Sequence, residues 1–282
     1  MQFKGIVGQE AIKQRLLATV KENRVSHAQL FLGPEGSGSL PLALAYAQYL
    51  SCEDRQPEDS CGVCASCRKY QKLVHPDLHF SYPFFAKHKE DTALSFIEQW
   101  REAFTAHPYL SMDIWRGYLE ADNKQANINI AECHQIIKKL SLKPFESEYK
   151  ILILWLPEYL DKEGNTLLKI IEEPQPNTLF LLVAQNQDQI LNTILSRTQL
   201  VKIPELSYEE IKNELIKRGQ SEQAAAEAAY LSNGNLTEAL QLLHHDGNGY
   251  HQQFISWLRL CVSNKVPAVS YTHLTLPTNR EV

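Results

Sequence analysis

Apolar residues along this chain form two kinds of segment, short continuous runs and longer stretches with helical spacing. The continuous runs indicate strands buried on both faces of a sheet, and they cover residues 27–32, 149–154 and 178–184. In the longer stretches apolar positions recur every three or four residues, which predicts amphipathic helices; these cover residues 6–20, 41–50, 128–140 and 165–174. Helices that alternate with buried strands predict an α/β fold.

The pattern changes after residue 203, where short helices follow one another without strands. Helical spacing covers residues 207–218, 221–231 and 235–244, and resumes near residue 251. We therefore expect an α/β core domain over 1–203, a small helical lid domain over 204–246, and the start of a third helical domain over 247–263. The periodicity then stops, and we expect residues 264–282 to be foreign or read-through sequence.

Composition restricts the class of protein. The chain has 282 residues, of which 44% are hydrophobic and 22% are charged, as in a globular protein with more than one domain. A net charge of -5 argues against a free-standing nucleic-acid binder, although a local basic face is still compatible with it. No signal peptide and no stretch of 18 apolar residues is visible, so we expect a cytoplasmic protein without a membrane segment.

A glycine-rich stretch, LFLGPEGSGSL, joins the first strand to the helix over 41–50. This is the arrangement of a phosphate-binding P-loop, whose backbone N–H groups surround phosphates at a helix N-terminus. Gly33, Gly36 and Gly38 supply the loop, and they are the candidate nucleotide-binding residues. The motif G-x-x-x-x-G-K-[ST] is incomplete, because Ser39 stands in the lysine position and Leu40 in the position of the Mg²⁺-binding hydroxyl.

The acidic pair of an NTPase is also missing. In a P-loop NTPase the strand over 149–154 should end in acids that hold Mg²⁺ and position the attacking water, but Trp155 and Leu156 follow it here. Glu158 lies two residues farther on and does not replace them. We therefore expect that ATP is not hydrolysed, while the sequence leaves open whether it still binds.

Four cysteines with the spacing C-x8-C-x2-C-x2-C predict a structural zinc site. A C-x2-C step lets two thiolates reach one metal from a tight turn, and four thiolates leave no open position for a substrate. The predicted zinc ligands are Cys52, Cys61, Cys64 and Cys67, in a knuckle over 52–67. The other two cysteines, Cys133 and Cys261, lie in helical patterns and are expected in the core.

Two basic features each allow two interpretations. Arg197, in the segment Ser196-Arg197-Thr198, is placed either to cap a helix C-terminus or to act as an arginine finger on a neighbour's γ-phosphate. A lysine cluster is either a solvated face, which we favour, or a contact for DNA phosphates; it comprises Lys138, Lys139, Lys143 and Lys150.

In combination these motifs resemble the δ′ subunits of bacterial DNA polymerase III clamp loaders, within the AAA+ superfamily. The resemblance covers about residues 3–250 and rests on HAQLFLGP, the four-cysteine module after the first core helix, His75-Pro76-Asp77, NTLLKIIEEP and ILSRTQ. The last stretch is similar to the family's Ser-Arg-Cys motif, with Thr198 in place of the cysteine. The resemblance implies an AAA+ type αβα core with a P-loop, a zinc knuckle and a helical lid, followed by a collar domain that holds a pentamer together.

The resemblance also implies a role and partners. Arg197 would act in trans on the ATP site of an adjacent subunit, and the partners would be the clamp-loader ATPase subunits, the δ subunit, the sliding clamp indirectly, and primed DNA through the complex. The family's ATPases carry an arginine in the lid where Thr237 stands here. Together with the changes at Ser39 and Trp155, this predicts a subunit that does not hydrolyse ATP but completes a neighbour's site.

Two other classes of function are compatible with the motifs. An active P-loop NTPase with an unusual pocket would need a lysine and an acid from elsewhere, and the sequence offers no candidate lysine. A zinc-ribbon nucleic-acid-binding protein is disfavoured by the net charge and by the loop over 53–60, in which Arg55 is the single basic residue.

Overall fold

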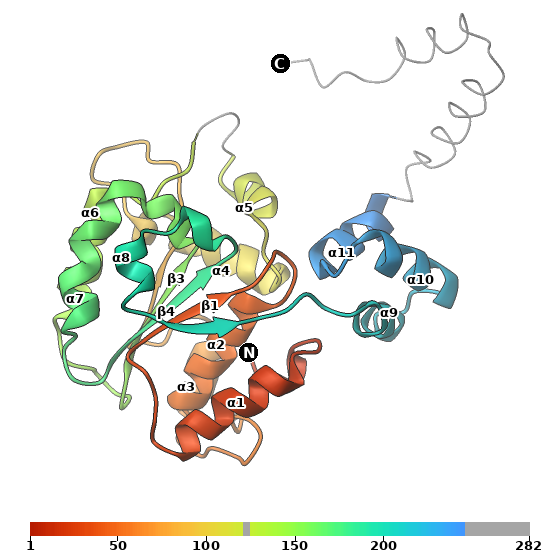
Figure 1. Ribbon diagram of the computed structural model, residues 1–282, viewed down its shortest axis with the longest axis horizontal. Coiled ribbons are helices and arrows are strands. Elements are labelled where there is room, and N and C mark those ends of the chain that lie inside the picture. Colours follow the sequence, from red (N-terminus) through yellow and green to blue (C-terminus); the bar gives the residue numbers. More distant parts are fainter. Residues whose placement is uncertain (121–124, 246–282) are drawn as a thin grey trace, which may run out of the picture.

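The computed structural model describes residues 1–120 and 125–245, which contain one five-stranded parallel sheet in the order β2-β3-β4-β1-β5 (Figure 1). The strands are β1 (Ala28–Leu32), β2 (Leu78–Ser81), β3 (Lys150–Trp155), β4 (Thr178–Ala184) and β5 (Gln199–Lys202). In the centre, Leu30 of β1 lies opposite Leu182 of β4 and Leu200 of β5. The runs predicted as strands are therefore β1, β3 and β4, the three inner strands.

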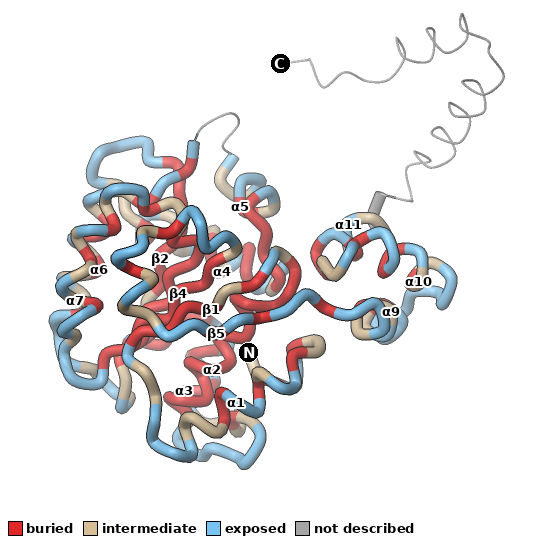
Figure 2. Tube along the Cα trace, in the orientation of Figure 1, coloured by how far each residue is buried: buried red, intermediate tan, exposed pale blue. Residues whose placement is uncertain are grey.

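Alternate residues of each inner strand face two separate apolar clusters, so the core has three layers. In β3, Ile153 and Trp155 join one cluster, whereas Leu152 and Leu154 join the other. Figure 2 shows the buried strands between the two helical layers. The first layer contains α1 (Glu10–Lys21), α2 (Ser39–Leu50), α3 (Ala65–Gln71), α4 (Ile97–Ala106) and α5 (Met112–Tyr118). The second contains α6 (Ile130–Leu140), α7 (Leu168–Glu172) and α8 (Asn192–Leu195).

This arrangement confirms the predicted αβα core. Short 3₁₀ segments complete the connections: η1 (Phe3–Gly5), η2 (Ala93–Phe96), η3 (Pro157–Leu167) and η4 (Gln187–Gln189). None of the helices within the described part of the chain is long and apolar enough to cross a membrane.

Three further helices lie beside the core, after the extended segment that follows β5 (Figure 1). They are α9 (Tyr208–Lys217), α10 (Glu222–Leu231) and α11 (Leu236–His245), close to the predicted ranges. The hydroxyl of Ser207 caps α9 by accepting a hydrogen bond from the N–H of Glu210 (3.3 Å). The hydroxyl of Ser221 caps α10 by accepting one from the N–H of Ala224 (3.2 Å). The helices enclose their own apolar cluster, which Tyr109 of the core joins. The helix expected over 247–263 and the tail over 264–282 lie outside the described residues.

Four details differ from the sequence-based expectation. Edge strand β5 was not predicted, because Val201 is its one buried residue. Helix α3 was not predicted either, since its N-terminal cap is a cysteine, Cys64, rather than a usual capping residue. The expected helix over 165–174 is α-helical only in α7; the part before Leu168 belongs to η3.

The fourth difference concerns the lysine cluster. Lys150 is only 4% exposed and does not belong to a surface patch. Its Nζ donates hydrogen bonds to the carbonyl oxygens of Lys139 (3.1 Å) and Leu142 (2.7 Å). A lysine that reaches the C-terminal end of α6 satisfies carbonyls that have no partner within that helix.

Candidate functional site

The predicted P-loop is a glycine-rich turn between a strand and a helix. It leaves the carboxyl end of β1 and enters α2 at Ser39. Gly36 and Gly38 have φ angles of +73° and +92°, a left-handed conformation that residues with a Cβ adopt only under strain. The hydroxyls of Ser37 and Ser39 lie 3.0 Å apart inside the loop, where the motif would otherwise have its lysine.

The space at the mouth of this loop is too small for a nucleotide. The cavity next to it measures about 20 Å³ and is lined by Tyr109, Leu110, Trp155 and Val183 in addition to the loop. One water needs roughly 10–15 Å³ of such volume, whereas pockets for small ligands measure about 300–1,000 Å³. In this conformation the loop therefore has room for one or two waters.

Trp155 occupies the position of the missing acid and belongs to the aromatic core. It is 2% exposed, and its ring centroid lies 5.4 Å from that of Trp100. Glu158 does not take over the acid's place, because its carboxylate accepts hydrogen bonds from the backbone N–H groups of Gln185 (2.6 Å) and Asn186 (2.8 Å). Burial raises the pKa of Glu158 above its usual value, and the hydrogen bonds of its side chain stabilise the loop after β4.

The start of helix α11 closes the P-loop from the lid side. The N–H of Leu236 donates to the carbonyl oxygen of Gly36 (3.4 Å), and the amide of Asn235 donates to the carboxylate of Glu35 (3.4 Å). A Cβ on Gly36 would lie 1.9 Å from Oδ1 of Asn235. Burial raises the pKa of Glu35, and this residue lines the same small cavity as the loop.

Thr237, which stands in the position of the lid arginine, also joins lid and core. Its hydroxyl donates to the carbonyl oxygen of Tyr109 (2.6 Å), and the hydroxyl of Tyr109 accepts from the N–H of Val7 (2.8 Å). Tyr109 and Asn235 were not among the residues predicted for this site. Their role depends on contacts between residues that are 128 and 200 positions apart in the chain.

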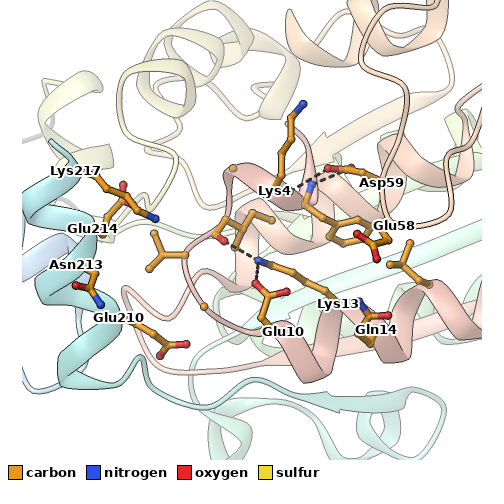
Figure 3. Close-up of a pocket in the computed structure, with 16 residues that line it drawn as sticks. Lys4, Glu10, Lys13, Gln14, Glu58, Asp59, Glu210, Asn213, Glu214 and Lys217 are labelled. Atoms are coloured by element: carbon orange, nitrogen blue, oxygen red, sulfur yellow. Dashed lines mark hydrogen bonds and ion pairs between the residues drawn. The ribbon is translucent and has the colours of Figure 1, made fainter.

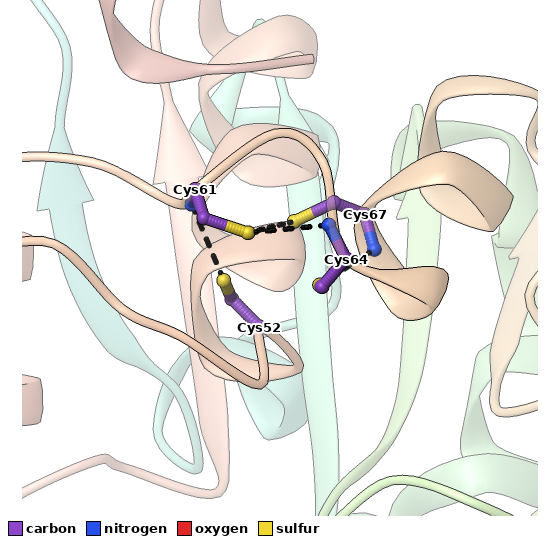
Figure 4. Close-up of side chains that lie close together, drawn as sticks. All are labelled: Cys52, Cys61, Cys64 and Cys67. Carbon is purple, nitrogen blue, oxygen red and sulfur yellow. Dashed lines mark hydrogen bonds between the residues drawn. The ribbon is translucent and has the colours of Figure 1, made fainter.

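The four predicted zinc ligands come together in one cluster (Figure 4). Their sulfur atoms all lie within 4.8 Å of one another, and Sγ of Cys61 is 4.0 Å from Sγ of Cys67. A tetrahedral zinc with Zn–S bonds of about 2.3 Å places its sulfurs about 3.8 Å apart. The geometry of the thiols therefore fits one zinc ion, with Cys52, Cys61, Cys64 and Cys67 as its ligands.

Backbone N–H groups point at these sulfurs, as expected around thiolates. Cys52, Cys61 and Cys64 each accept a hydrogen bond from an N–H group three to nine residues away, each at 3.3 Å. Hydrogen bonds from the N–H groups of Val63 and Cys64 lower the pKa of the Cys61 thiol to about 7. Cys133 lies apart from the cluster and is fully buried in the core, as predicted.

His75 and Asp77, from the stretch His75-Pro76-Asp77 on which the resemblance partly rests, have structural partners. Nε2 of His75 lies 3.1 Å from a carboxylate oxygen of Glu146. The carboxylate of Asp77 accepts backbone hydrogen bonds from Glu146 (2.8 Å) and Ser147 (2.9 Å). These contacts connect the segment after the cysteine cluster to the loop before β3.

Arg197 lies at the opposite end of the sheet from the P-loop. It precedes Gln199, which pairs with Gln29 near the amino end of β1, whereas the P-loop follows the carboxyl end of that strand. Five residues of strand separate the two ends by about 16 Å. The arginine side chain is far shorter than this distance, so Arg197 does not reach the P-loop of its own chain.

The guanidinium of Arg197 is bonded within its own chain. It forms an ion pair with Glu172 of α7 (2.6 Å) and donates to the carbonyl oxygen of Thr193 (2.8 Å). The contact to Thr193 caps the end of α8 and fits the first interpretation of Arg197 from the sequence; the second, an arginine finger, stays a prediction. Glu172 was not predicted as a partner of Arg197, since the two residues lie 25 positions apart in the chain.

A larger cleft of about 580 Å³ lies elsewhere, between the N-terminal segment, α1 and α9 (Figure 3). It is distinct from the P-loop and has a polar lining. Several of its carboxylates are already bonded within the chain: Glu10 to Lys13, Asp59 to the N–H groups of Phe3 and Lys4, Glu210 to Ser207, and Glu214 to Arg218. We therefore assign no site to it.

Comparison with known proteins gives one family. The family model described as "DNA polymerase III, delta subunit" matches residues 8–207. DNA polymerase III subunit delta' of Bacillus subtilis is 26% identical over 239 residues, which are 84% of this chain and 60% of that protein. DNA polymerase III subunit gamma of Buchnera aphidicola is also 26% identical, over 88% of this chain and 60% of that protein. The chain thus spans about 60% of the length of these two relatives.

Solved structures with a similar fold include two proteins of Thermotoga maritima. A DNA polymerase III gamma subunit-related protein has a TM-score of 0.37 and 18% identity over 78% of this chain and 58% of that chain. A RuvB mutant has a TM-score of 0.45 and 16% identity over 84% of this chain and 61% of that chain.

Proposed function

The chain belongs to the family described as DNA polymerase III, delta subunit, and we propose that it is a clamp-loader subunit of the δ′ kind. In this role it does not hydrolyse ATP itself. It supplies Arg197 in trans to the ATP site of a neighbouring ATPase subunit, while the assembled complex loads the sliding clamp on primed DNA. Its partners are the ATPase subunits and the δ subunit, and its cysteines hold a structural zinc.

The observation that carries this proposal is the contrast between the two ends of the sheet. At the carboxyl end, the P-loop cavity measures about 20 Å³ and is lined by Trp155 and Tyr109, and the lid bonds to the loop. At the amino end, one strand length of about 16 Å away, the side chain of Arg197 is 29% exposed. An arginine at this distance is suited to a phosphate on another subunit and not to one on its own.

The small size of the same cavity argues against the second candidate function, an active NTPase. Hydrolysis requires an acid near the γ-phosphate and a cation that stabilises its charge. The acid's position is taken by Trp155, and Glu35 brings a carboxylate to the loop in place of a cation. The third, a zinc ribbon that binds nucleic acid, is disfavoured because the cysteine module is bonded to the core through Lys69 and Glu146.

The test is Arg197→Ala in the assembled loader. An arginine finger is worth about 10³–10⁵ in turnover at the site that it serves, so hydrolysis at the facing site should fall by at least about 10³-fold. The matched control is Arg218→Ala, which removes another partly exposed arginine from an ion pair, with Glu214, in α9. Both variants should fold as the unaltered chain does. Unchanged ATP turnover with Arg197→Ala would rule out the trans role.

A further inference from the structure

The ion pair between Glu172 and Arg197 holds the guanidinium against its own subunit. Nη2 of Arg197 lies 2.6 Å from Oε1 of Glu172, and Nη1 donates to the carbonyl oxygen of Thr193 at 2.8 Å and to Oγ of Ser196 at 3.3 Å. Each terminal nitrogen therefore has at least one N–H group directed at an acceptor of the same chain. To bind a phosphate on another subunit, the guanidinium has to exchange at least the carboxylate for the new acceptor.

The backbone on the carboxylate side of this pair is fixed, while the pair itself is accessible. Ile171, the preceding residue, is 2% exposed in the core, and its carbonyl oxygen lies 3.1 Å from Nε2 of His27. The side chain of Glu172 is 50% exposed and that of Arg197 is 29% exposed. A neighbouring subunit can thus approach both side chains without disturbing the core.

The bonding of the arginine is incomplete in this position. Nε of Arg197 is buried and has no hydrogen-bond partner within the described residues. A buried donor without an acceptor raises the free energy of the conformation that contains it. The guanidinium is therefore held mainly by the Glu172 carboxylate and the Thr193 carbonyl.

We propose that Glu172 restrains Arg197 in the free subunit and that a phosphate on the neighbouring subunit displaces Glu172 when the two subunits dock. This inference rests on the proposed trans role of Arg197. The displacement is an exchange of acceptors and breaks no covalent bond: a γ-phosphate offers more negative charge and the same two-oxygen geometry that a guanidinium recognises. Glu172 is a positioning residue and does not contact the reacting atoms.

The ion pair between Glu172 and Arg197 should measurably raise the subunit concentration that gives half-maximal ATP turnover. Ion pairs with this degree of exposure change an equilibrium by about 1.5- to fivefold. Glu172→Gln should therefore lower the concentration of this subunit that gives half-maximal ATP turnover by about 1.5- to fivefold. The maximal turnover should stay the same, because in the docked state the arginine has already left Glu172.

The chain offers a matched control next to the tested residue. Glu173 is also exposed and forms no ion pair within the described part of the chain. Glu173→Gln removes the same charge from the same segment, so it should leave both the half-maximal concentration and the maximal turnover unchanged. A difference between the two variants then reports the contact with Arg197 and not the net charge.

The first experiment uses the full chain alone and does not depend on the trans role. Phenylglyoxal modifies accessible arginines, and peptide mass spectrometry gives the rate of modification at Arg197. The rate should rise by about 1.5- to fivefold in Glu172→Gln and not in Glu173→Gln. Equal rates in both variants would overturn the restraint.

The second experiment titrates each variant into the remaining subunits of the loader and measures ATP turnover. A lower half-maximal concentration with unchanged maximal turnover supports the restraint. A lower maximal turnover in Glu172→Gln, or no shift at all, overturns it. Arg197→Ala is run in parallel: if it leaves turnover unchanged, the trans role itself fails, whatever the modification rates show about the ion pair.

Discussion

Mg-ATP should not bind the isolated chain at concentrations up to about 1 mM, because the P-loop is closed by the chain's own residues. A bound nucleotide requires the lid to move away from the loop. This movement breaks three hydrogen bonds, which join Leu236 to Gly36, Asn235 to Glu35, and Thr237 to the carbonyl oxygen of Tyr109. At about 1 kcal/mol each, the three bonds add about 3 kcal/mol to the free energy of binding.

This penalty weakens binding by about 150-fold. A site that otherwise had a dissociation constant of about 10 μM would therefore bind at about 1.5 mM from the closure alone. The missing lysine and the missing magnesium ligand, at Ser39 and Leu40, weaken it further. The cavity of about 20 Å³ shows that the loop has no space for a triphosphate until the lid has moved.

Isothermal titration calorimetry of the full chain with Mg-ATP measures this directly. Ser39→Lys is the informative variant, because it restores the lysine and leaves the closure intact; it should give no binding heat either. Combining it with Asn235→Ala and Thr237→Ala, which remove two of the closing contacts, should bring binding into the measurable range. A dissociation constant below about 100 μM for the unaltered chain would refute the reasoning. Tight binding of Mg-ATP by Ser39→Lys alone would show that the missing lysine, and not the closed lid, prevents nucleotide binding.

Further predictions concern the zinc site and the pH dependence of stability. Metal analysis by mass spectrometry should find one zinc per chain, and Cys64→Ser should lose it and lower the temperature of unfolding, because metal binding and local folding are coupled; a chain purified without zinc would contradict the assignment. Burial, aided by the charges of Lys139 and Lys150, lowers the pKa of His79 to about 4. The unfolded chain then binds more protons than the folded chain between pH 6.5 and 4, so the free energy of unfolding should fall by about 2 kcal/mol from pH 7 to 5. Urea denaturation should show this loss reduced in His79→Gln; equal losses in both proteins would exclude His79 as the cause.

The sequence was sufficient to predict the elements whose burial produces a regular pattern of apolar residues. The inner strands β1, β3 and β4 were predicted to within one or two residues, since both of their faces are covered and their apolar runs are continuous. The lid helices were predicted from their helical spacing, and in the structure Ser207 and Ser221 cap the first two of them. The grouping of the four cysteines was also predictable, because two C-x2-C steps and one further nearby cysteine bring four thiols within reach of one metal ion.

The sequence was insufficient to predict the features that depend on tertiary contacts. Edge strand β5 exposes Gln199 and Lys202, so its residues show no apolar run. Lys150 was expected at the surface because lysine usually is, yet two helix-end carbonyls hold its ammonium group inside. Glu172 carries no local signal, since its contact with Arg197 joins α7 to the end of α8.

The glycines of the P-loop illustrate why a motif and a function can separate. Gly36 is required in this structure by Asn235, whose side chain would lie 1.9 Å from a Cβ there, and by a φ angle of +73°. Both requirements come from packing between loop and lid and involve no nucleotide. The glycine pattern therefore fits a closed, purely structural junction as well as an active site. What distinguishes the two is the chemistry around the loop, where Ser39 and Trp155 replace the groups that would bind and hydrolyse a nucleotide.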